Sequence, residues 1–158
     1  MLDEIVQCVR NYEGVTRKNP ISTLTSCFSG VDNFGKTMVS FGDDSAILKS
    51  DDKFILFAAD GIWSKLTEHD PVWAGYCAVL ANVNDIYAMG GKPLALTNVM
   101  STKSNDGCPK IVKGIADGCK KFMVPMVGGH LHPDTIVETL SISIVGEASA
   151  VLTSFDAT

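Results

Sequence analysis

The sequence has little basic charge. Its 13 lysine and arginine residues are outnumbered by 18 aspartate and glutamate residues, so the formal net charge is -5 and the pI is about 5.0. Surfaces that bind nucleic acid or anionic membranes need clusters of positive charge. We therefore expect neither as a partner. Nucleotides are not excluded, because a metal ion can bridge acidic side chains to phosphate oxygens.

The sequence also lacks paired cysteines. Its five cysteines are odd in number, scattered, and contain no C-x-x-C pair: Cys8, Cys27, Cys77, Cys108 and Cys119. This pattern is typical of reduced thiols and not of a disulfide framework, so it favours a cytoplasmic protein.

Long hydrophobic runs are missing as well. Apolar stretches such as FILFAA, residues 54–59, are far shorter than the about 20 residues of a membrane-spanning helix. The first residues carry Asp3 and Glu4 where a signal peptide would carry positive charge. We expect a soluble, cytoplasmic chain.

The periodic segments that are present predict three helices and five strands. Helices are expected at residues 1–12, 69–91 and 109–122, and strands at 44–50, 53–60, 94–101, 123–129 and 137–147. Residues 13–23 are polar and are predicted to form a loop. The strand at 123–129 is expected to be short and buried, at a sheet edge or bulge because of Pro125.

This order predicts an α/β or α+β fold, with helices packed on one face of a mixed β-sheet. We expect an N-terminal helix and flexible loop over residues 1–40, one domain over 41–150, and a tail over 151–158.

Three aspartates stand at places where such folds form binding sites. Asp44 opens the first predicted strand, and Asp60 closes the second. A short turn joins these strands, so they are expected to pair antiparallel, which brings the two carboxylates close together. Asp85 lies within the long helix, on a stripe of mostly small residues. Asp85 could equally be an ordinary surface residue or the partner of a lysine.

Oxygen ligands from separate segments suit Mg²⁺, which takes a few carboxylates and completes its shell with water and phosphate oxygens. Neighbouring residues of a strand point to opposite faces. We therefore expect Asp44 to be the metal ligand, and Asp43 to cap a turn or meet a second ion.

The segment MVGGHLHPDT, residues 126–135, is a further candidate. Backbone N–H groups of Gly128 and Gly129 can face an anion, which predicts a phosphate-side turn. A zinc-type site on His130 and His132 is the alternative.

Four segments in this order resemble the N-terminal domain of the aminoimidazole ribonucleotide (AIR) synthetase superfamily, with similarity to selenophosphate synthetase and thiamine-monophosphate kinase. They are GDDSAIL, AADGIW, NVNDIYAMGGKP and VGGHLHPDT, followed by SISIVGEA. The resemblance covers residues 42 to about 147.

The resemblance implies an ATP and Mg²⁺ site with Asp44, Asp60 and Asp85 as metal ligands. The nucleotide-contacting positions that it implies are Asp43, Asn82, Gly128, Gly129 and His130. It further implies a homodimer, and phosphoryl transfer from ATP to a small-molecule acceptor.

The chain departs from the family pattern in four ways. His130 stands where kinase-type members have Asp, and Ala58 and Ala59 stand where those members have hydroxyl residues. Cys27 is not followed by the lysine of the selenophosphate enzymes, and the second domain of family enzymes is absent. The leading hypothesis is the ATP-binding part of an AIR synthase-related enzyme. The alternative is a non-catalytic nucleotide-binding dimerisation module.

Overall fold

The computed structural model describes residues 1–103, 108–133 and 135–154, and it divides into two compact units, Met1–Gly35 and Lys36–Thr158. The first unit holds three short helices, α1 (Leu2–Arg10), α2 (Glu13–Thr16) and α3 (Ile21–Ser26). No residue of these helices is buried.

The prediction of a loop over residues 13–23 is wrong, because α2 and the first turn of α3 lie there. Hydroxyl side chains sustain these turns by donating to carbonyls three or four residues earlier. Thr16 Oγ1 donates to the Tyr12 carbonyl at 3.4 Å, and Ser22 Oγ donates to the Asn19 carbonyl at 3.0 Å. Polar composition alone does not distinguish such helical turns from a loop.

The second unit contains a mixed sheet, as predicted, but the sheet has six strands where five were expected, because the short strand at Thr37–Val39 was not predicted. Its strands are β1 (Thr37–Val39), β2 (Ala46–Ser50), β3 (Lys53–Ile62), β4 (Lys92–Ser101), β5 (Met126–His132) and β6 (Thr139–Ala148). The strand order is β1-β2-β3-β6-β4-β5, and β4 and β5 are the parallel pair. The expected antiparallel pairing of the two strands around residues 46–57 is confirmed.

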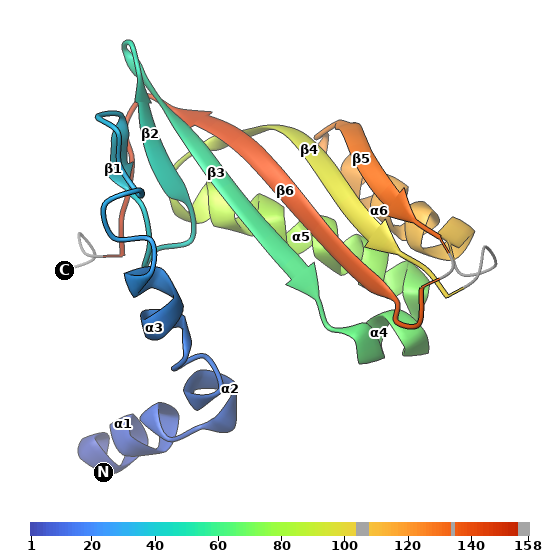
Figure 1. Ribbon diagram of the computed structural model, residues 1–158, viewed down its shortest axis with the longest axis horizontal. Helices are drawn as coiled ribbons and strands as arrows, with labels where there is room; N and C mark the ends of the chain where they lie inside the picture. The colour runs from blue at the N-terminus through green and yellow to red at the C-terminus, as the bar shows by residue number, and fades with distance from the viewer. Residues whose placement is uncertain (104–107, 134, 155–158) are drawn as a thin grey trace. The chain divides into compact units, whose positions relative to one another are not determined.

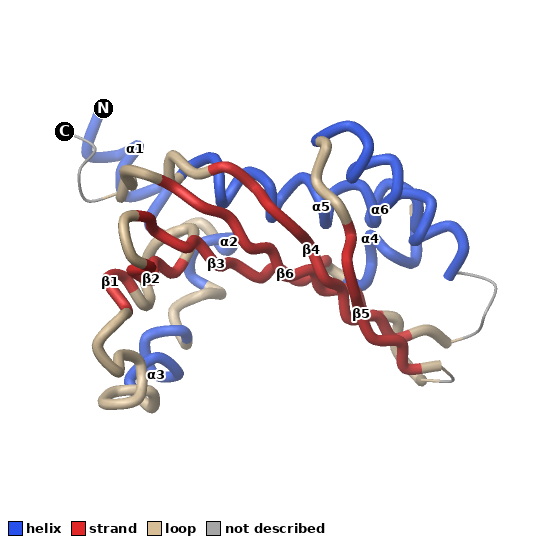
Figure 2. The backbone as a smooth tube through the Cα atoms, turned by 90° about the horizontal axis from the view of Figure 1, so that it is seen from above, coloured by secondary structure: helices blue, strands red, loops and turns tan. Residues whose placement is uncertain are grey.

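Three helices belong to this unit, α4 (Ser64–His69), α5 (Pro71–Ala88) and α6 (Cys108–Phe122). Figures 1 and 2 show α5 and α6 side by side on one side of the sheet. The core lies between these two layers, and it is built from side chains such as Leu56, Val83, Ile86 and Ile142, all fully buried. We call the other side of the sheet the open face.

The long helix has the ends that the sequence predicts. The Asp70 side chain accepts a hydrogen bond from the Trp73 backbone N–H at 2.9 Å, and Pro71 occupies the first turn. Beyond Ala88 the chain turns at Gly90, whose φ of 74° is the left-handed conformation that favours glycine. These signals hold the helix in register with the sheet below it.

Strand β6 shows the predicted alternation, with Leu140, Ile142 and Ile144 buried in the core. The expectation of a buried strand around residues 123–129 is wrong. The strand there is β5, which begins at Met126 and is exposed along almost all of its length. It is a sheet edge, which confirms one of the two positions that Pro125 predicted, and it pairs with β4 alone.

All five cysteines are free, as predicted. Within the described part of the chain, no helix combines the length and the apolar character that crossing a membrane requires.

We predict that Gly114→Ala destabilises the fold by about 1–3 kcal/mol, which is the usual cost of overpacking. A Cβ at this position of α6 would collide with the backbone carbonyl oxygen of Val72 on α5, and backbone cannot move aside like a side chain. The better helix propensity of alanine, about 1 kcal/mol, opposes this cost without cancelling it. Urea unfolding measures the change.

Gly128→Ala is the matched control, because its Cβ would make an ordinary 3.6 Å contact with the Thr97 side chain. Equal stability of the two variants would show that the α5–α6 contact is not as close as described.

Candidate functional site

The candidate site lies where strand β3 extends past strand β2. Their register pairs Ala46 with Phe57, and β3 continues to Ile62 while β2 begins at Ala46. Continuing this register backwards from Ala46 brings the Asp43–Asp44 segment alongside Asp60. The two carboxylate-bearing segments are therefore neighbours, as the hairpin predicts.

Asp43 and Asp44 do not lie on a strand, which corrects the expectation that Asp44 opens one. Both residues belong to the bend that leads into β2 at Ala46. The argument from strand alternation therefore does not apply to this pair. The turn around them needs side-chain oxygens to bind its backbone N–H groups, and this competes with strand pairing.

The Asp43 side chain is occupied by backbone contacts. One carboxylate oxygen accepts from the Asp44 N–H at 3.0 Å, and the other accepts from the Ser154 N–H at 2.9 Å. Asp43 thus ties the bend to the segment that follows β6. The Asp44 side chain is exposed beside it.

Asp85 approaches the same place from the helix layer. The hydroxyl of Ser45, a residue only 3% exposed, donates to the Asp85 backbone carbonyl at 3.2 Å and joins the bend to α5. Burial raises the pKa of the Asp85 carboxyl, and the charges of Asp60 and Asp44 raise it further, to about 6. The three carboxylates thus act on one another across three separate segments.

An Asn82 amide lies one helical turn before Asp85. It is fully buried, and its Nδ2 donates to the Ala78 carbonyl at 2.9 Å. Its Oδ1 has no hydrogen-bond partner among the described residues. A buried acceptor without a donor is costly, so this oxygen favours a donor that is not part of the chain.

The chemical type of these donors, carboxylate and amide oxygen, suits a hard cation. Carboxylate and amide oxygens are the ligands that Mg²⁺ prefers, and like charges that raise a pKa are relieved by a positive ion. As they stand, no three His, Cys, Asp or Glu side chains among the described residues lie close enough together to hold a metal ion. The arrangement therefore needs further ligands, such as water or phosphate oxygens, to complete a shell.

Gly128, Gly129 and His130 do not form the predicted turn. They lie within strand β5, because its parallel pairing with β4 includes all three residues. Register places Asp60, Ile142, Asn98 and Gly129 in one row across the sheet. Three strand spacings separate the row's ends, about 14 Å. Within one chain, Asp44 and Asp60 lie near enough to Asp85 for their charges to raise its pKa, and the Gly-Gly-His segment lies apart from Asp60.

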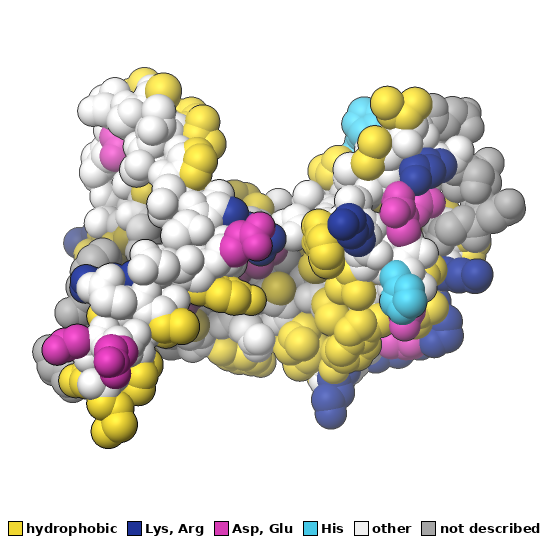
Figure 3. All heavy atoms as spheres, turned by 90° about the horizontal axis from the view of Figure 1, so that it is seen from below, with side chains coloured by type: hydrophobic (Ala, Val, Ile, Leu, Met, Phe, Trp, Pro, Cys, Tyr) yellow, Lys and Arg dark blue, Asp and Glu magenta, His cyan; other side chains and the backbone are white. Residues whose placement is uncertain are grey.

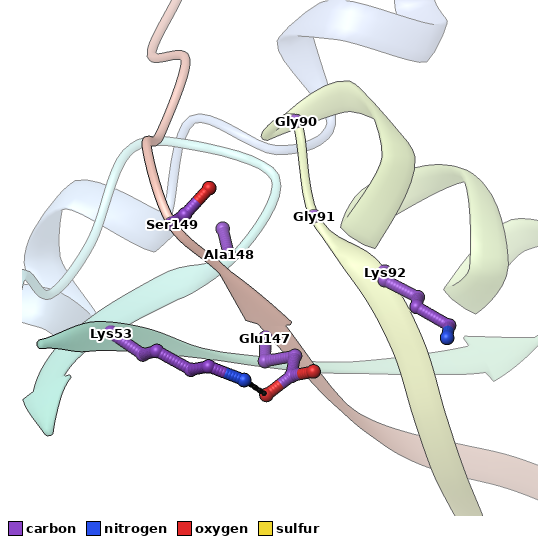
Figure 4. A pocket seen from close by; sticks show the side chains of 7 residues that line it. All are labelled: Lys53, Gly90, Gly91, Lys92, Glu147, Ala148 and Ser149. Atoms are coloured by element: carbon purple, nitrogen blue, oxygen red, sulfur yellow. Dashed lines mark hydrogen bonds and ion pairs between the residues drawn. The ribbon is translucent and has the colours of Figure 1, made fainter.

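A hollow of about 310 Å³ lies just beyond the C-terminal end of α5, where Gly90 and Gly91 line it, and Figure 4 shows the lining residues. Lys53 Nζ lies 2.7 Å from a carboxylate oxygen of Glu147. The hydrogen bond from Lys53 lowers the pKa of Glu147, with the charges of Lys53 and Lys92 adding to it. The ammonium group of Lys53 thus pairs with the Glu147 carboxylate. No lysine or arginine is among the groups that shift the pKa of Asp85.

Sequence reasoning missed Ser45 and Ser154. Ser45 anchors the Asp85 turn, and the Ser154 N–H binds Asp43. Both contacts join residues far apart in sequence, so local patterns carry no signal for them. The one available hint was Ser45 itself, a small polar residue placed where the chain enters the core.

Comparison with known proteins assigns the chain to a family. The model described as AIR synthase related protein, N-terminal domain, matches residues 42–148. The chain belongs to the AIR synthase related family. It is 51% identical over 150 residues to an uncharacterised protein of Methanocaldococcus jannaschii, covering 93% of this chain and 46% of that protein. It is 33% identical over 113 residues to the thiamine-monophosphate kinase of Pyrococcus abyssi, covering 66% and 36%.

Solved structures agree with the fold. A structure of Aquifex aeolicus thiamine-monophosphate kinase, described as complexed with AMPPCP and TMP, aligns with a TM-score of 0.72 at 19% identity. The alignment covers 87% of this chain and 45% of that one. The AIR synthase related chain thus spans less than half the length of these relatives.

The raised pKa of Asp85 predicts a pH-dependent effect of Asp85→Asn. Because the folded-state pKa of about 6 lies above the ordinary 3.8, protonation stabilises the fold below pH 3.8, and this stabilisation is lost as the pH rises through 6. Asparagine mimics the neutral acid. Without divalent ions, the variant should melt above the wild type at pH 7.5, and the difference should shrink towards pH 5.

Differential scanning calorimetry at both pH values measures this difference. Asp52→Asn, in the exposed turn between β2 and β3, is the control and should show no such pH dependence. A wild type that melts above Asp85→Asn at pH 7.5 in chelator would contradict the like-charge arrangement.

Proposed function

We propose that this chain binds ATP with Mg²⁺ and is the ATP-binding part of an enzyme that transfers a phosphoryl group to a small-molecule acceptor. The observation that carries the proposal is the half-buried Asp85, held between the charges of Asp60 and Asp44. Perturbed carboxylates of this kind cluster at functional sites, because burial and neighbouring like charges shift pKa values there.

The roles follow from the positions of the side chains. Asp44, Asp60 and Asp85 would hold Mg²⁺, which supplies neutralisation of phosphate charge when it is bound. Asn82 would offer its unpaired Oδ1 to a donor that enters with the ligand. Asp43 would keep the bend in shape through its two backbone hydrogen bonds.

The relatives support nucleotide use. One relative is named a kinase, and the aligned structure is described as complexed with AMPPCP, an ATP analogue, and TMP. This chain spans less than half of their length. The likeness therefore does not establish the acceptor or the activity of a whole enzyme, and both are part of this proposal. The five free thiols support a reducing compartment, the cytoplasm, as the place of action.

We further propose that a second copy of the chain covers the open face of the sheet. This face carries large apolar side chains that are half exposed, including Phe57 at 51% and Val127 at 64%. A shallow hollow of about 100 Å³ lies among them, lined also by Thr97, Ser143 and Val145. Seen from below, the chain also carries hydrophobic side chains at its surface, with acidic and basic side chains beside them (Figure 3). Exposed apolar surface of this kind is typical of an interface.

A dimer would also bear on Gly128, Gly129 and His130. They are about 14 Å from Asp60 within one chain, so a nucleotide at the aspartates would reach such a segment more readily from a second copy. Their expected nucleotide contact is therefore part of the dimer proposal.

We predict that ATP with Mg²⁺ raises the melting temperature. Ligand at 100 times its Kd stabilises by about 2.7 kcal/mol, which is a shift of several degrees. Asp60→Asn and Asp85→Asn should lose the shift, because each removes a metal ligand, while Asp52→Asn should keep it. A scanning fluorimetry series with ATP alone, Mg²⁺ alone and both together measures it.

A wild type that shows no shift at millimolar ATP with Mg²⁺ would overturn nucleotide binding. Phosphate release assays then separate the two hypotheses: turnover that Asp85→Asn abolishes supports an enzyme, whereas binding without turnover supports a dimerisation module.

We predict that Phe57→Glu converts the protein to a monomer, because a charge on the open face cannot be buried between two sheets without a partner. Light scattering coupled to size exclusion measures the mass. Val112→Glu is the matched control: Val112 is 47% exposed, on α6 and away from the open face. A wild type that is already monomeric at micromolar concentration would contradict the dimer.

A further inference from the structure

Another hollow lies on the helix side of the sheet, where α5 and α6 meet. Its volume is about 250 Å³, and it is lined by Asp70, Val72, Trp73 and Tyr76 at the start of α5 and by Asp117 of α6. The hollow does not belong to the open face, because both helices lie on the other side of the sheet (Figures 1 and 2). A second copy of the chain on the open face would therefore leave it accessible.

Part of the lining is aromatic. The rings of Trp73 and Tyr76 are stacked, with centroids 5.2 Å apart and planes inclined by 10°. Tyr76 also contacts Phe122 of α6, at a centroid distance of 5.9 Å, so a ring from each helix holds it in place. Trp73 is nevertheless 50% exposed. The aromatic wall is thus fixed by its neighbours, and part of its surface is open to a ligand.

Two carboxylates complete the lining, and no basic residue lines the hollow within the described part of the chain. Asp70 Oδ1 accepts the Trp73 backbone N–H at 2.9 Å, which fixes this carboxylate at the first turn of α5. Asp117 Oδ2 accepts from Lys113 Nζ, one turn earlier on α6, at 2.5 Å. Both members of this ion pair are well exposed. Such pairs contribute little to stability, so Lys113 can leave Asp117 to another cation at small cost.

The two helices hold the rings and the Asp117 carboxylate at a fixed spacing. Their backbones approach closely because glycines face each other. A Cβ on Gly75 would collide with the Ile111 carbonyl oxygen, and one on Gly114 would collide with that of Val72. The lining residues of α5 and α6 are therefore preorganised, which lowers the entropy cost of binding a ligand between them.

Aromatic rings beside carboxylates are suited to an organic cation. A cation is attracted to the face of an aromatic ring, most strongly to tryptophan, and alkylated ammonium ions are recognised in this way. Anions are disfavoured by the two negative charges of Asp70 and Asp117. A metal ion such as Ca²⁺ or Mg²⁺ needs about six oxygen ligands, and rings and a valine side chain cannot supply them.

We propose that this hollow binds a small alkylated ammonium ion, with its alkyl groups against Trp73 and Tyr76 and its charge beside Asp70 and Asp117. The volume suits such a ligand, because pockets for drug-sized molecules begin at about 300 Å³. The site is distinct from the aspartate cluster. Asp70 and Asp85 stand at opposite parts of α5, about 22 Å apart at a rise of 1.5 Å per residue. Binding here requires neither ATP nor Mg²⁺.

Titration of the full chain with choline chloride, followed by nuclear magnetic resonance at constant ionic strength and without nucleotide or Mg²⁺, tests the proposal. Trp63 and Trp73 are the two tryptophans of the sequence. The indole N–H signal of Trp73 should shift and saturate, and that of Trp63 should stay in place. The neutral carbon analogue of choline, in which a tert-butyl group replaces trimethylammonium, should bind about tenfold more weakly, because it has the shape without the charge.

Two variants remove the two kinds of contact, and backbone amide signals of α5 report their affinities. Trp73→Leu keeps an apolar side chain without the ring, and it should weaken choline binding by about fivefold. Trp63→Leu is the matched control, because Trp63 is 65% exposed and does not line the hollow, and it should bind as the wild type does. Asp70→Asn removes the charge, whereas asparagine caps a helix as well as aspartate does. It should also weaken binding by about fivefold.

Lys113→Gln removes the cation that competes for Asp117, so choline should bind about twofold more tightly. Thermal melting shows that each variant is folded. Equal affinity for choline and its neutral analogue would overturn the site, since the hollow would then select shape alone. Wild-type affinity in folded Trp73→Leu or Asp70→Asn, or no saturable shift of the Trp73 signal, would overturn it as well.

Discussion

The candidate site depends on a mismatch in strand length. Strand β3 has ten residues, whereas its neighbour β2 has five, so the last part of β3 has a partner on one side only. The bend of Asp43 and Asp44 lies in the space that a longer β2 would fill. If β2 continued in register, hydrogen bonds to β3 would occupy the backbone groups of Asp43 and Asp44. The Ser45 hydroxyl could then not donate to the Asp85 backbone carbonyl on α5.

The aspartate cluster is costly to the isolated chain. Asp85 is partly buried beside two like charges, and no lysine or arginine is among the groups that shift its pKa. Elsewhere the same chain pairs its carboxylates, as with Lys53 and Glu147 or Lys103 and Glu68. The contrast argues that the cluster is kept for a ligand, since pairing is available to this chain where function does not prevent it.

The elements that sequence predicted best are those whose signals are local. Asp70 and Gly90 mark the two ends of α5 in the sequence, and apolar and polar residues alternate along β6. The short hairpin predicted that Asp44 lies near Asp60, whereas the grouping of Asp85 with them came from the family resemblance. The predictions that failed depend on neighbouring elements. Pro125 indicated an edge or a bulge for β5, and β5 is an edge strand, but the strand was expected to be buried and is exposed. Gly128 and Gly129 indicated a turn, yet pairing with β4 holds them extended.

The sheet separates two kinds of ligand chemistry by the alternation of its side chains. Asp60 shares its row with the core residue Ile142, on the helix side and near the β2 edge. His130 lies one row along, which places it on the open face and at the β5 edge. Oxygen donors and nitrogen donors are therefore held apart by both the thickness and the width of the sheet. A one-residue change in the register of β5 would abolish that separation by turning the histidines towards the helices.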